Sequence, residues 1–350
     1  MRVEVRTDDS ALVALDREWG DLHRRSSTAT LYNTSDWARV WWLHFGEPDG
    51  LRLFLVRDDA GTLVGLAPMQ KTLDGNGRAV LRYLGGLDVS DYLDALALAG
   101  REQDVADALV RAWVDQLCHN VSSVELHAIR DASPLRGAFS RLAPVSGSRL
   151  EMEQDDVCPV VTLPSSWEAY LNQLEGKQRR ELRRKVRKAG QDVLVSWYQV
   201  RGGSRPELDE AMETFFDLHA RSDPMKATFM TPRMRAFFRD VAEMAARAGW
   251  LALDVLLVNG QPAATQLTFD YDNQILLYNS GYDPHVAADL SPGWLLLSFA
   301  IEHAIMLGRR RFDFLRGSEE YKYRFGGRPE HLWRLRWECG CARWPATTAA

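Results

Sequence analysis

Two segments in the second half of the sequence contain the residue types that bind anions. The first is SPGW, residues 291–294, which stands where a strand and its loop lead into an apolar helix. A helix start presents unpaired N–H groups and the positive end of the helix dipole, so it suits a phosphate or an oxyanion. Pro292 fits a first helical turn, and Gly293 lets a ligand approach the backbone closely. The alternative is a plain helix cap, since Ser-Pro-Gly is common at helix starts.

The second segment is the basic stretch KQRRELRRKVRKAG, residues 177–190. Leu182, Val186 and Ala189 form a narrow apolar stripe along the helix that this spacing predicts. The remaining surface is covered by cations, which include Arg179, Arg180, Arg183, Arg184, Arg187 and Lys188. Like charges at i,i+4 spacing cost roughly 0.2–0.5 kcal/mol per pair, so phosphates of a nucleotide-linked substrate, CoA or tRNA would offset the repulsion. The alternative is a solvated face paired with acids elsewhere, such as the EMEQDD stretch.

A third segment, FDFLRGSEEYKYRFGG at residues 312–327, places charged and aromatic residues directly behind a short apolar stretch. Residues that follow a strand end in this way often line a cleft. The alternative is a short amphipathic helix in which Tyr321 and Phe325 pack at i,i+4 spacing and Lys322 is solvated. The residues alone leave both interpretations open.

The composition excludes several classes of protein. The chain has 350 residues, 46% of them hydrophobic and 26% charged, which predicts a globular protein of one large or two ordinary domains. Its net charge of −5 argues against a protein that coats nucleic acid, and no DNA partner is expected. The longest apolar stretch is interrupted by Glu302 and His303, so no transmembrane segment is expected.

The start and the cysteines indicate a cytoplasmic protein. The opening residues MRVEVRTDDS have no apolar core of a signal peptide. The four cysteines form no C-x-x-C pair, so we expect reduced thiols and no metal site. They are Cys118, Cys158, Cys339 and Cys341.

Periodicity and turn signals predict the elements of the second half. Ser165 or Ser166 can cap a helix from Trp167, and Thr231 can cap one that starts at Pro232. Three strands, 250–258, 262–271 and 274–282, are separated by the turns Asn259-Gly260 and Asp272-Asn273. A buried helix at 293–307, a strand at 309–315, a short helix at 318–326 and a strand at 331–340 follow.

The first half shows a fainter version of the same order. A helix at 35–45, a hairpin at 51–70, a strand at 92–99, a helix at 102–117 and a strand at 121–129 are predicted. The fold class is therefore α+β, with two similar domains that each hold a mixed, mostly antiparallel sheet flanked by helices. We place the boundary in the polar stretch 146–156, with domains at 1–155 and 156–345.

The order of elements from Trp250 onward is similar to the core of the GNAT N-acyltransferase superfamily. More specifically, the chain resembles tandem-GNAT proteins of the CelD type, known from cellulose biosynthesis, and of the FemAB type. The likeness rests on the basic helix, the hairpin NGQPAATQL, the run SGYDPHVAADLSPGWLLL and the segment FDFLRGSEEYKYRFGG, with LYNTSDWARVWWLHFG and VGLAPM in the first half. In place of the usual loop Q/R-x-x-G-x-G/A stands ADLSPG, a form that suits CelD-type members.

This resemblance implies an acyl-CoA donor held between a strand that ends at Tyr282 and a strand that diverges from it. The donor-binding residues it implies are Tyr282, Ser291, Gly293, Trp294 and Arg316. The residues it implies for substrate phosphates are Arg180, Arg183 and Arg184. Lys322 matches the lysine that FemAB-type members have near the acyl-transfer centre, where an ammonium would stabilise an oxyanion. The candidate general bases are Asp283, His285, Glu319 and Glu320, of which we retain Asp283 and Glu319.

The expected activity is acyl transfer to an amine or hydroxyl of a cell-envelope polysaccharide precursor, a sugar or a peptide. The first domain is expected to have lost donor binding, because LALAGREQDV places acidic residues where a phosphate would lie. One alternative is a FemAB-type transferase that uses aminoacyl-tRNA. Another is a non-catalytic scaffold in polysaccharide export.

Overall fold

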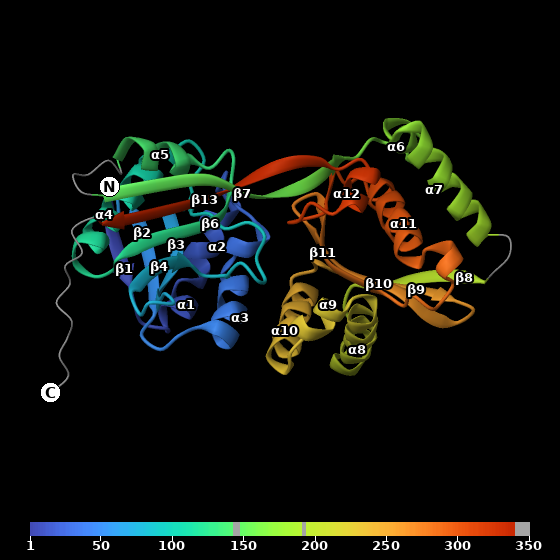
Figure 1. Ribbon diagram of the computed structural model, residues 1–350. Coiled ribbons are helices and arrows are strands. Elements are labelled where there is room, and N and C mark those ends of the chain that lie inside the picture. Colours follow the sequence, from blue (N-terminus) through green and yellow to red (C-terminus); the bar gives the residue numbers. More distant parts are fainter. Residues whose placement is uncertain (143–147, 191–193, 340–350) are drawn as a thin grey trace. The chain divides into compact units, whose positions relative to one another are not determined.

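The computed structural model describes residues 1–142, 148–190 and 194–339 (Figure 1). The chain divides into two compact units. The first unit comprises Met1–Asp156 together with the described residues from His331 onward, and the second comprises Val157–Glu330.

The first unit is built on a mixed sheet. Its elements are β1 (Arg2–Arg6), α1 (Ala11–Ala14), α2 (Asp16–Arg24), α3 (Ser35–Phe45), β2 (Leu51–Arg57), β3 (Leu63–Leu73), β4 (Ala79–Tyr83), β5 (Leu96–Ala97), α4 (Glu102–His119), β6 (Ser123–Arg130), α5 (Pro134–Leu142) and most of β7 (Ser148–Thr162). The strands β1 to β4 pair antiparallel in sequence order, and β6 lies parallel to β4. The last strand of the chain, β13 (Arg328–Cys339), pairs antiparallel with β6.

The second unit repeats this arrangement. Its elements are α6 (Trp167–Gln173), α7 (Gly176–Ala189), β8 (Val195–Val200), α8 (Arg205–Ser222), α9 (Pro224–Phe229), α10 (Pro232–Arg247), β9 (Leu251–Val258), β10 (Gln261–Tyr271), β11 (Gln274–Tyr282), α11 (Pro292–Met306), β12 (Arg311–Asp313) and α12 (Glu320–Arg324). The strands β8 to β11 pair antiparallel in sequence order, β12 lies parallel to β11, and the end of β7 pairs antiparallel with β12. The predicted α+β class and the two similar halves, each with a mixed, mostly antiparallel sheet, are confirmed.

Helices cover both faces of the sheet in the second unit. In Figure 1, α8 and α10 lie on one side of β9 to β11, and α11 lies on the other. Apolar side chains of α11 pack on the strands, with Leu295 and Leu296 against Leu256 and Ala264. Burial of such side chains contributes roughly 1.5–3 kcal/mol each and fixes the position of α11 on the sheet.

Turn and cap residues define the elements that position the site. Asn259 and Gly260 both have positive φ, as do Asp272 and Asn273, which fits tight hairpins that match the twist of the flanking strands. The backbone N–H of Ala169 donates to the Ser166 hydroxyl, so the cap predicted for α6 is confirmed.

One expectation about the domain boundary is corrected. The first unit ends at Asp156, within the long strand β7, close to the expected boundary. The expected domain 156–345 loses its last strand, however, since Leu332–Glu338 of β13 pairs with β6 of the first unit. The strands β1, β4 and β8 were not predicted at all.

Some expectations concern features that the structure can only partly address. Cys158 is buried, whereas the side chains of Cys118 and Cys339, and residue Cys341, lie outside the described part of the chain. Within residues 1–142, 148–190 and 194–339, no group of three or more acidic, histidine or cysteine residues could hold a metal ion. None of the described helices has the length and apolar character needed to cross a membrane.

Candidate active site

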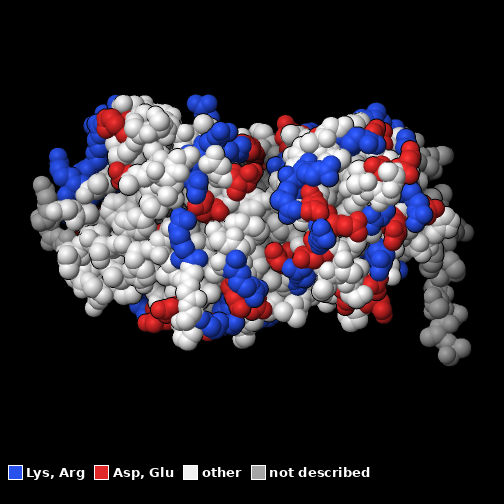
Figure 2. Space-filling view, turned by 180° about the vertical axis from the view of Figure 1, so that it is seen from behind, with Lys and Arg blue, Asp and Glu red and all other residues white. Residues whose placement is uncertain are grey.

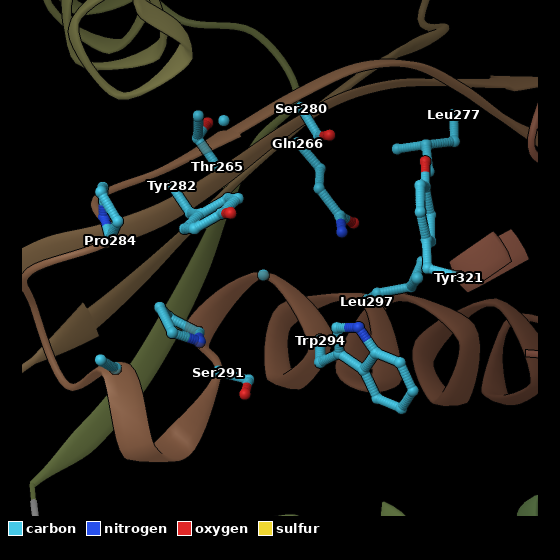
Figure 3. Close-up of a pocket in the computed structure, with 14 residues that line it drawn as sticks. Thr265, Gln266, Leu277, Ser280, Tyr282, Pro284, Ser291, Trp294, Leu297 and Tyr321 are labelled. Carbon is cyan, nitrogen blue, oxygen red and sulfur yellow. The ribbon is translucent and has the colours of Figure 1, made fainter. Parts of the chain in front are cut away.

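A cavity opens in the second unit where two parallel strands separate. The strands β11 and β12 pair only from Gln274 to Leu276, opposite Arg311 to Asp313, and β11 then continues to Tyr282 paired with β10 alone. The cavity of about 510 Å³ lies beside this part of β11, from which β12 has separated (Figure 3). The start of α11 and the ring of Tyr321 form its other walls. We call it the strand cavity.

The start of α11 lies at one end of the strand cavity and has an unusual backbone conformation. Ser291 adopts a left-handed conformation with φ of 53°, and no described side chain caps the first turn of the helix. The Lys185 ammonium donates a hydrogen bond of 2.6 Å to the Ser291 hydroxyl. A buried cation therefore lies at the positive end of a 15-residue helix, an arrangement that favours a bound anion.

A second cavity, also of about 510 Å³, adjoins the first and shares Ser291 and Trp294 with it. We call it the basic cavity. Five cationic side chains line it, namely Lys177, Arg180, Arg184, Lys185 and Arg324, together with one acid, Glu181. In Figure 2, Lys and Arg side chains gather at the left edge of the molecule, where α7 ends near the grey residues.

The cations of the basic cavity are only partly neutralised by the protein. Glu181 pairs with Arg184 at 2.9 Å and approaches Lys185 at 3.6 Å, and the hydrogen bond from Arg184 lowers the pKa of its carboxyl. Arg324 pairs with Glu320 at 2.6 Å. Within the described residues, neither Lys177 nor Arg180 forms an ion pair. The cavity thus has positive charge that a ligand phosphate would neutralise.

Comparison with known proteins identifies a domain in the second unit. Residues 176–323 match the family model described as an acetyltransferase (GNAT) domain. The second unit therefore contains a GNAT acetyltransferase domain. In the GNAT fold of the second unit, both cavities lie at the strand divergence and at the helix start that follows it.

Solved structures share the fold over nearly the whole chain. The FemX structure is 10% identical, has a TM-score of 0.62, and the match covers 95% of this chain and 96% of FemX. A conserved protein from Bacteroides thetaiotaomicron is 11% identical with a TM-score of 0.61 and coverages of 96% and 100%. L-PGS from Bacillus licheniformis is 12% identical with a TM-score of 0.53 and coverages of 94% and 91%. No curated protein matches the sequence significantly.

The GNAT site contains several of the residues expected from the sequence. Tyr282, Gly293, Ser291 and Trp294 all line the strand cavity, and the last two also line the basic cavity. Trp294 packs its ring against Phe325 with centroids 4.9 Å apart. A Cβ at Gly293 would lie 3.5 Å from the ring of Tyr282, an ordinary van der Waals contact, so the start of α11 and Tyr282 are close neighbours here.

The three arginines expected to bind phosphate do not act together. Arg180 and Arg184 line the basic cavity. Arg183 points to another face of α7, where it pairs with Glu168 and borders a small cavity with Trp167. The periodicity of α7 explains this separation, because adjacent helical positions differ by about 100°. Arg183 is therefore removed from the proposed phosphate site.

Lys322 occupies a different environment from the one we expected. Its side chain is buried, and its ammonium donates to the carbonyl oxygens of Leu315, Arg316 and Gly317 at 3.1, 2.7 and 3.2 Å. It also contacts Glu319 at 3.0 Å. These acceptors occupy the three N–H donors of the ammonium. Lys322 lines neither cavity. In this arrangement the lysine holds the loop behind β12, and an oxyanion would have to displace one of its partners.

The remaining expected residues also lie outside the cavity linings. Asp283 accepts from Arg221 at 2.8 Å and from the backbone N–H of His285 at 2.8 Å. The hydrogen bond from His285, followed by that from Arg221, lowers the pKa of Asp283, which makes this carboxylate a weak general base. Glu319 is more than half exposed, and Arg316 contributes its backbone carbonyl to Lys322.

Two residues of the site were missed by sequence reasoning. Lys185 stands on the buried side of α7 with Leu182 and Ala189, and a lysine within an apolar stripe was the available signal. Gln266 lies in a strand that also holds Thr265 and Thr268, so nothing local distinguished it. Tyr321 was expected either to line the cleft or to pack in a short helix; its ring lines the strand cavity, and burial raises the pKa of its phenol. The phenol therefore stays protonated at neutral pH.

Proposed function

We propose that the second unit transfers an acyl group from an acyl-CoA-type donor. The donor phosphates would bind in the basic cavity, and the chain that carries the thioester would enter the strand cavity. The observation that carries this proposal is the contact of 2.6 Å between Lys185 and Ser291, where the two cavities meet at the start of α11. Charge-assisted hydrogen bonds of this kind are about twice as strong as neutral ones.

The chemistry needs few protein groups. The acceptor nitrogen or oxygen attacks the acyl carbon, the new bond forms, and the bond to sulfur breaks. The protonated phenol of Tyr321 could donate a hydrogen bond to the oxyanion or supply the proton that the leaving thiolate takes up. The described lining of the strand cavity contains no carboxylate or imidazole, so an amine acceptor would enter neutral or lose its proton to water.

The acceptor is proposed from the resemblance. CelD-type proteins suggest an amine or hydroxyl of a cell-envelope polysaccharide precursor or sugar, and FemAB-type proteins suggest a peptide. The family match argues for an enzyme and leaves the non-catalytic scaffold without support.

Calorimetric titration with acetyl-CoA and longer acyl-CoAs tests the donor. We expect micromolar binding that weakens at least tenfold in Lys185→Met. Arg179→Met is the matched control, because Arg179 lies on the same helix, contacts Asn172 and does not line the basic cavity. Absence of binding across the whole panel would refute the CoA donor.

A second candidate is an aminoacyl-tRNA donor, which the excess of cations in the basic cavity favours. Charge reversal of Arg180 and Arg184 together should then abolish binding of charged tRNA. Arg183→Glu is the control, because Arg183 points away from this cavity. Unchanged tRNA binding in the double variant would exclude this candidate.

A further inference from the structure

Gln266 is a buried polar residue in the wall of the strand cavity. Only 3% of its surface is exposed, and its side-chain oxygen Oε1 has no hydrogen-bond partner. Figure 3 shows its amide pointing from β10 into the space above α11, between Trp294 and Tyr321. A buried acceptor without a partner costs roughly 1–3 kcal/mol, so such groups in native proteins call for an explanation.

The sheet register fixes Gln266 in this position. It lies opposite Asp254 of β9 and Ser280 of β11, and directly opposite residues point to the same face of an antiparallel sheet. Ala264, two residues earlier, packs beneath α11 on that face. The side chain therefore cannot leave the cavity without a change of register.

Several neighbouring polar groups have partners of their own. The Asp254 carboxylate accepts from Gln199 at 2.9 Å, and the Thr265 hydroxyl donates to the backbone carbonyl of Asp254 at 2.9 Å. The Ser280 carbonyl accepts from Lys226 at 2.6 Å. Among the described residues that line the strand cavity, Gln266 is the one with a buried side-chain oxygen that lacks a partner.

The rest of the wall near Gln266 is mostly apolar, apart from the hydroxyls of Ser280 and Tyr321. Leu277, Leu297 and the ring of Trp294 lie around the same space. An alkyl chain would pack against these apolar groups, but it would displace water and leave the Gln266 oxygen without a hydrogen-bond partner. A chain that carries an N–H or O–H group would pack against them and also donate a hydrogen bond to this oxygen.

We propose that Gln266 determines the specificity of the strand cavity, because its amide oxygen accepts a hydrogen bond from an N–H or O–H group on the entering chain. This inference rests on the proposed function and identifies the substrate class, a donor chain that presents a hydrogen-bond donor inside the cavity. The group could belong to the acyl substituent, as in an amino- or hydroxyacyl group. It could also be an amide of the arm that joins the acyl group to the phosphates.

Two arms of one experiment distinguish these sources. The first arm compares the binding of 3-hydroxybutyryl-CoA and butyryl-CoA, which differ by one hydroxyl, to the wild type and to Gln266→Met. If the acyl group is the source, the wild type should prefer the hydroxyacyl donor about tenfold, and the variant should lose or reverse the preference. The second arm compares CoA with adenosine 3′,5′-bisphosphate, which lacks the arm. If the arm is the source, only CoA should bind the variant about tenfold more weakly.

Two further variants keep the test independent of folding. Gln266→Glu retains an oxygen acceptor on a side chain of the same size. In whichever of the two comparisons Gln266→Met changes binding, Gln266→Glu should behave like the wild type. Gln70→Met is the matched control, since Gln70 on β3 also has a buried side-chain oxygen without a partner but lies in the first unit. It should leave donor binding unchanged.

The inference and the proposed function fail in different ways. A wild-type protein that binds no acyl-CoA but binds charged tRNA refutes the CoA donor. The inference then predicts that Gln266→Met loses the difference in affinity between charged and deacylated tRNA. The inference is overturned, and the proposed function is kept, if the wild type binds a donor and Gln266→Met binds every probe with the same affinity and the same preference.

Discussion

The helices α4 and α11 occupy the same place in the two units but have opposite charges at their starts. Each follows four strands that pair antiparallel in sequence order and leads into a strand that is parallel to the fourth of them. In α4 the carboxylate of Glu102 accepts hydrogen bonds from the backbone N–H of Gly100 and from the Ser27 hydroxyl, at 3.0 and 2.6 Å. In α11 the first turn has no acid, and Lys185 lies beside it.

This difference shows that topology provides a helix start and that local charge decides its use. The side chain of Glu102 already supplies an anion at α4, and the Ser27 hydrogen bond lowers the pKa of this carboxyl, so it stays ionised. A ligand phosphate would meet like charge there. At α11 the corresponding place is open and positively charged, which explains how one of two similar units can bind the donor.

The strongest test of the comparison makes α11 resemble α4. We expect Lys185→Glu to weaken acyl-CoA binding about 100- to 1,000-fold, because it replaces a buried cation at the phosphate site with an anion. Calorimetric titration measures the change. Arg101→Glu at the start of α4 is the control and should leave the affinity unchanged. Equal losses in both variants would contradict the assignment of the donor site to the second unit.

Buried aspartates give the next comparison. Burial raises the pKa of Asp254 in the second unit to about 7 and that of Asp94 in the first to about 6. Each carboxyl keeps its proton in the folded protein above the pH at which the unfolded chain releases it, so the free energy of unfolding falls as pH rises from about 4 to about 7. In the wild type, Asp254 should lower the free energy of unfolding by about 2–4 kcal/mol over this pH range, and Asp94 should lower it by less. We expect Asp254→Asn and Asp94→Asn each to remove the corresponding pH-dependent loss.

Denaturant unfolding at pH 5 and pH 8 measures this effect. The gain from each substitution should be larger at pH 8 than at pH 5. A gain that does not depend on pH would mean that the substitution acts through packing instead of ionisation.

One glycine in each unit lies against a helix, and substitution of the two glycines compares how well each unit tolerates an added side-chain carbon. A side-chain carbon at Gly281 of β11 would overlap the backbone of His219 in α8, whereas one at Gly65 of β3 would meet only the side chain of Val105 in α4. Backbone cannot yield as a side chain can, so Gly281→Ala should destabilise by about 3 kcal/mol and Gly65→Ala by about 1 kcal/mol. Thermal unfolding checks the order, and a reversed order would refute the argument.

The smallest effect is expected where α4 is made to resemble α11. Glu102→Gln removes the carboxylate at this helix start and should cost less than about 1 kcal/mol of stability. It should not create a second CoA site, because no described lysine replaces Lys185 at that position. The stoichiometry of the calorimetric titration checks this, and two sites per chain would show that removal of the acid alone is sufficient.

The sequence was sufficient to predict the elements that local signals define. The turn at Asn259-Gly260, the cap at Ser166 and the helix start at Ser291 all depend on neighbouring residues, and each is found where it was expected. Four of the expected donor-site residues line the strand cavity for the same reason, since the strand end and the helix start bring them together.

Features that depend on backbone conformation or on distant partners were not predictable. The carbonyl groups that surround the Lys322 ammonium belong to Leu315, Arg316 and Gly317, but only the conformation of this loop turns them toward it. The pairing of β13 with β6 joins segments with no local signal for each other, which is why the boundary at 156–345 was wrong at its far end. Lys185 did have a signal, a polar residue in an apolar stripe, and a search for such exceptions would have found it.

The pairing of β6 with β13 has a consequence for synthesis of the protein. Trp333 of β13 donates to Asp131, which lies 202 residues earlier in the sequence. A ribosome that has finished every other strand of the first unit must still translate the whole second unit before this strand emerges. The nascent first unit therefore exposes an open sheet edge at β6 for many seconds, at translation rates of about 5–20 residues per second. Molecular chaperones that shield such edges would act on the half of the chain that was made first.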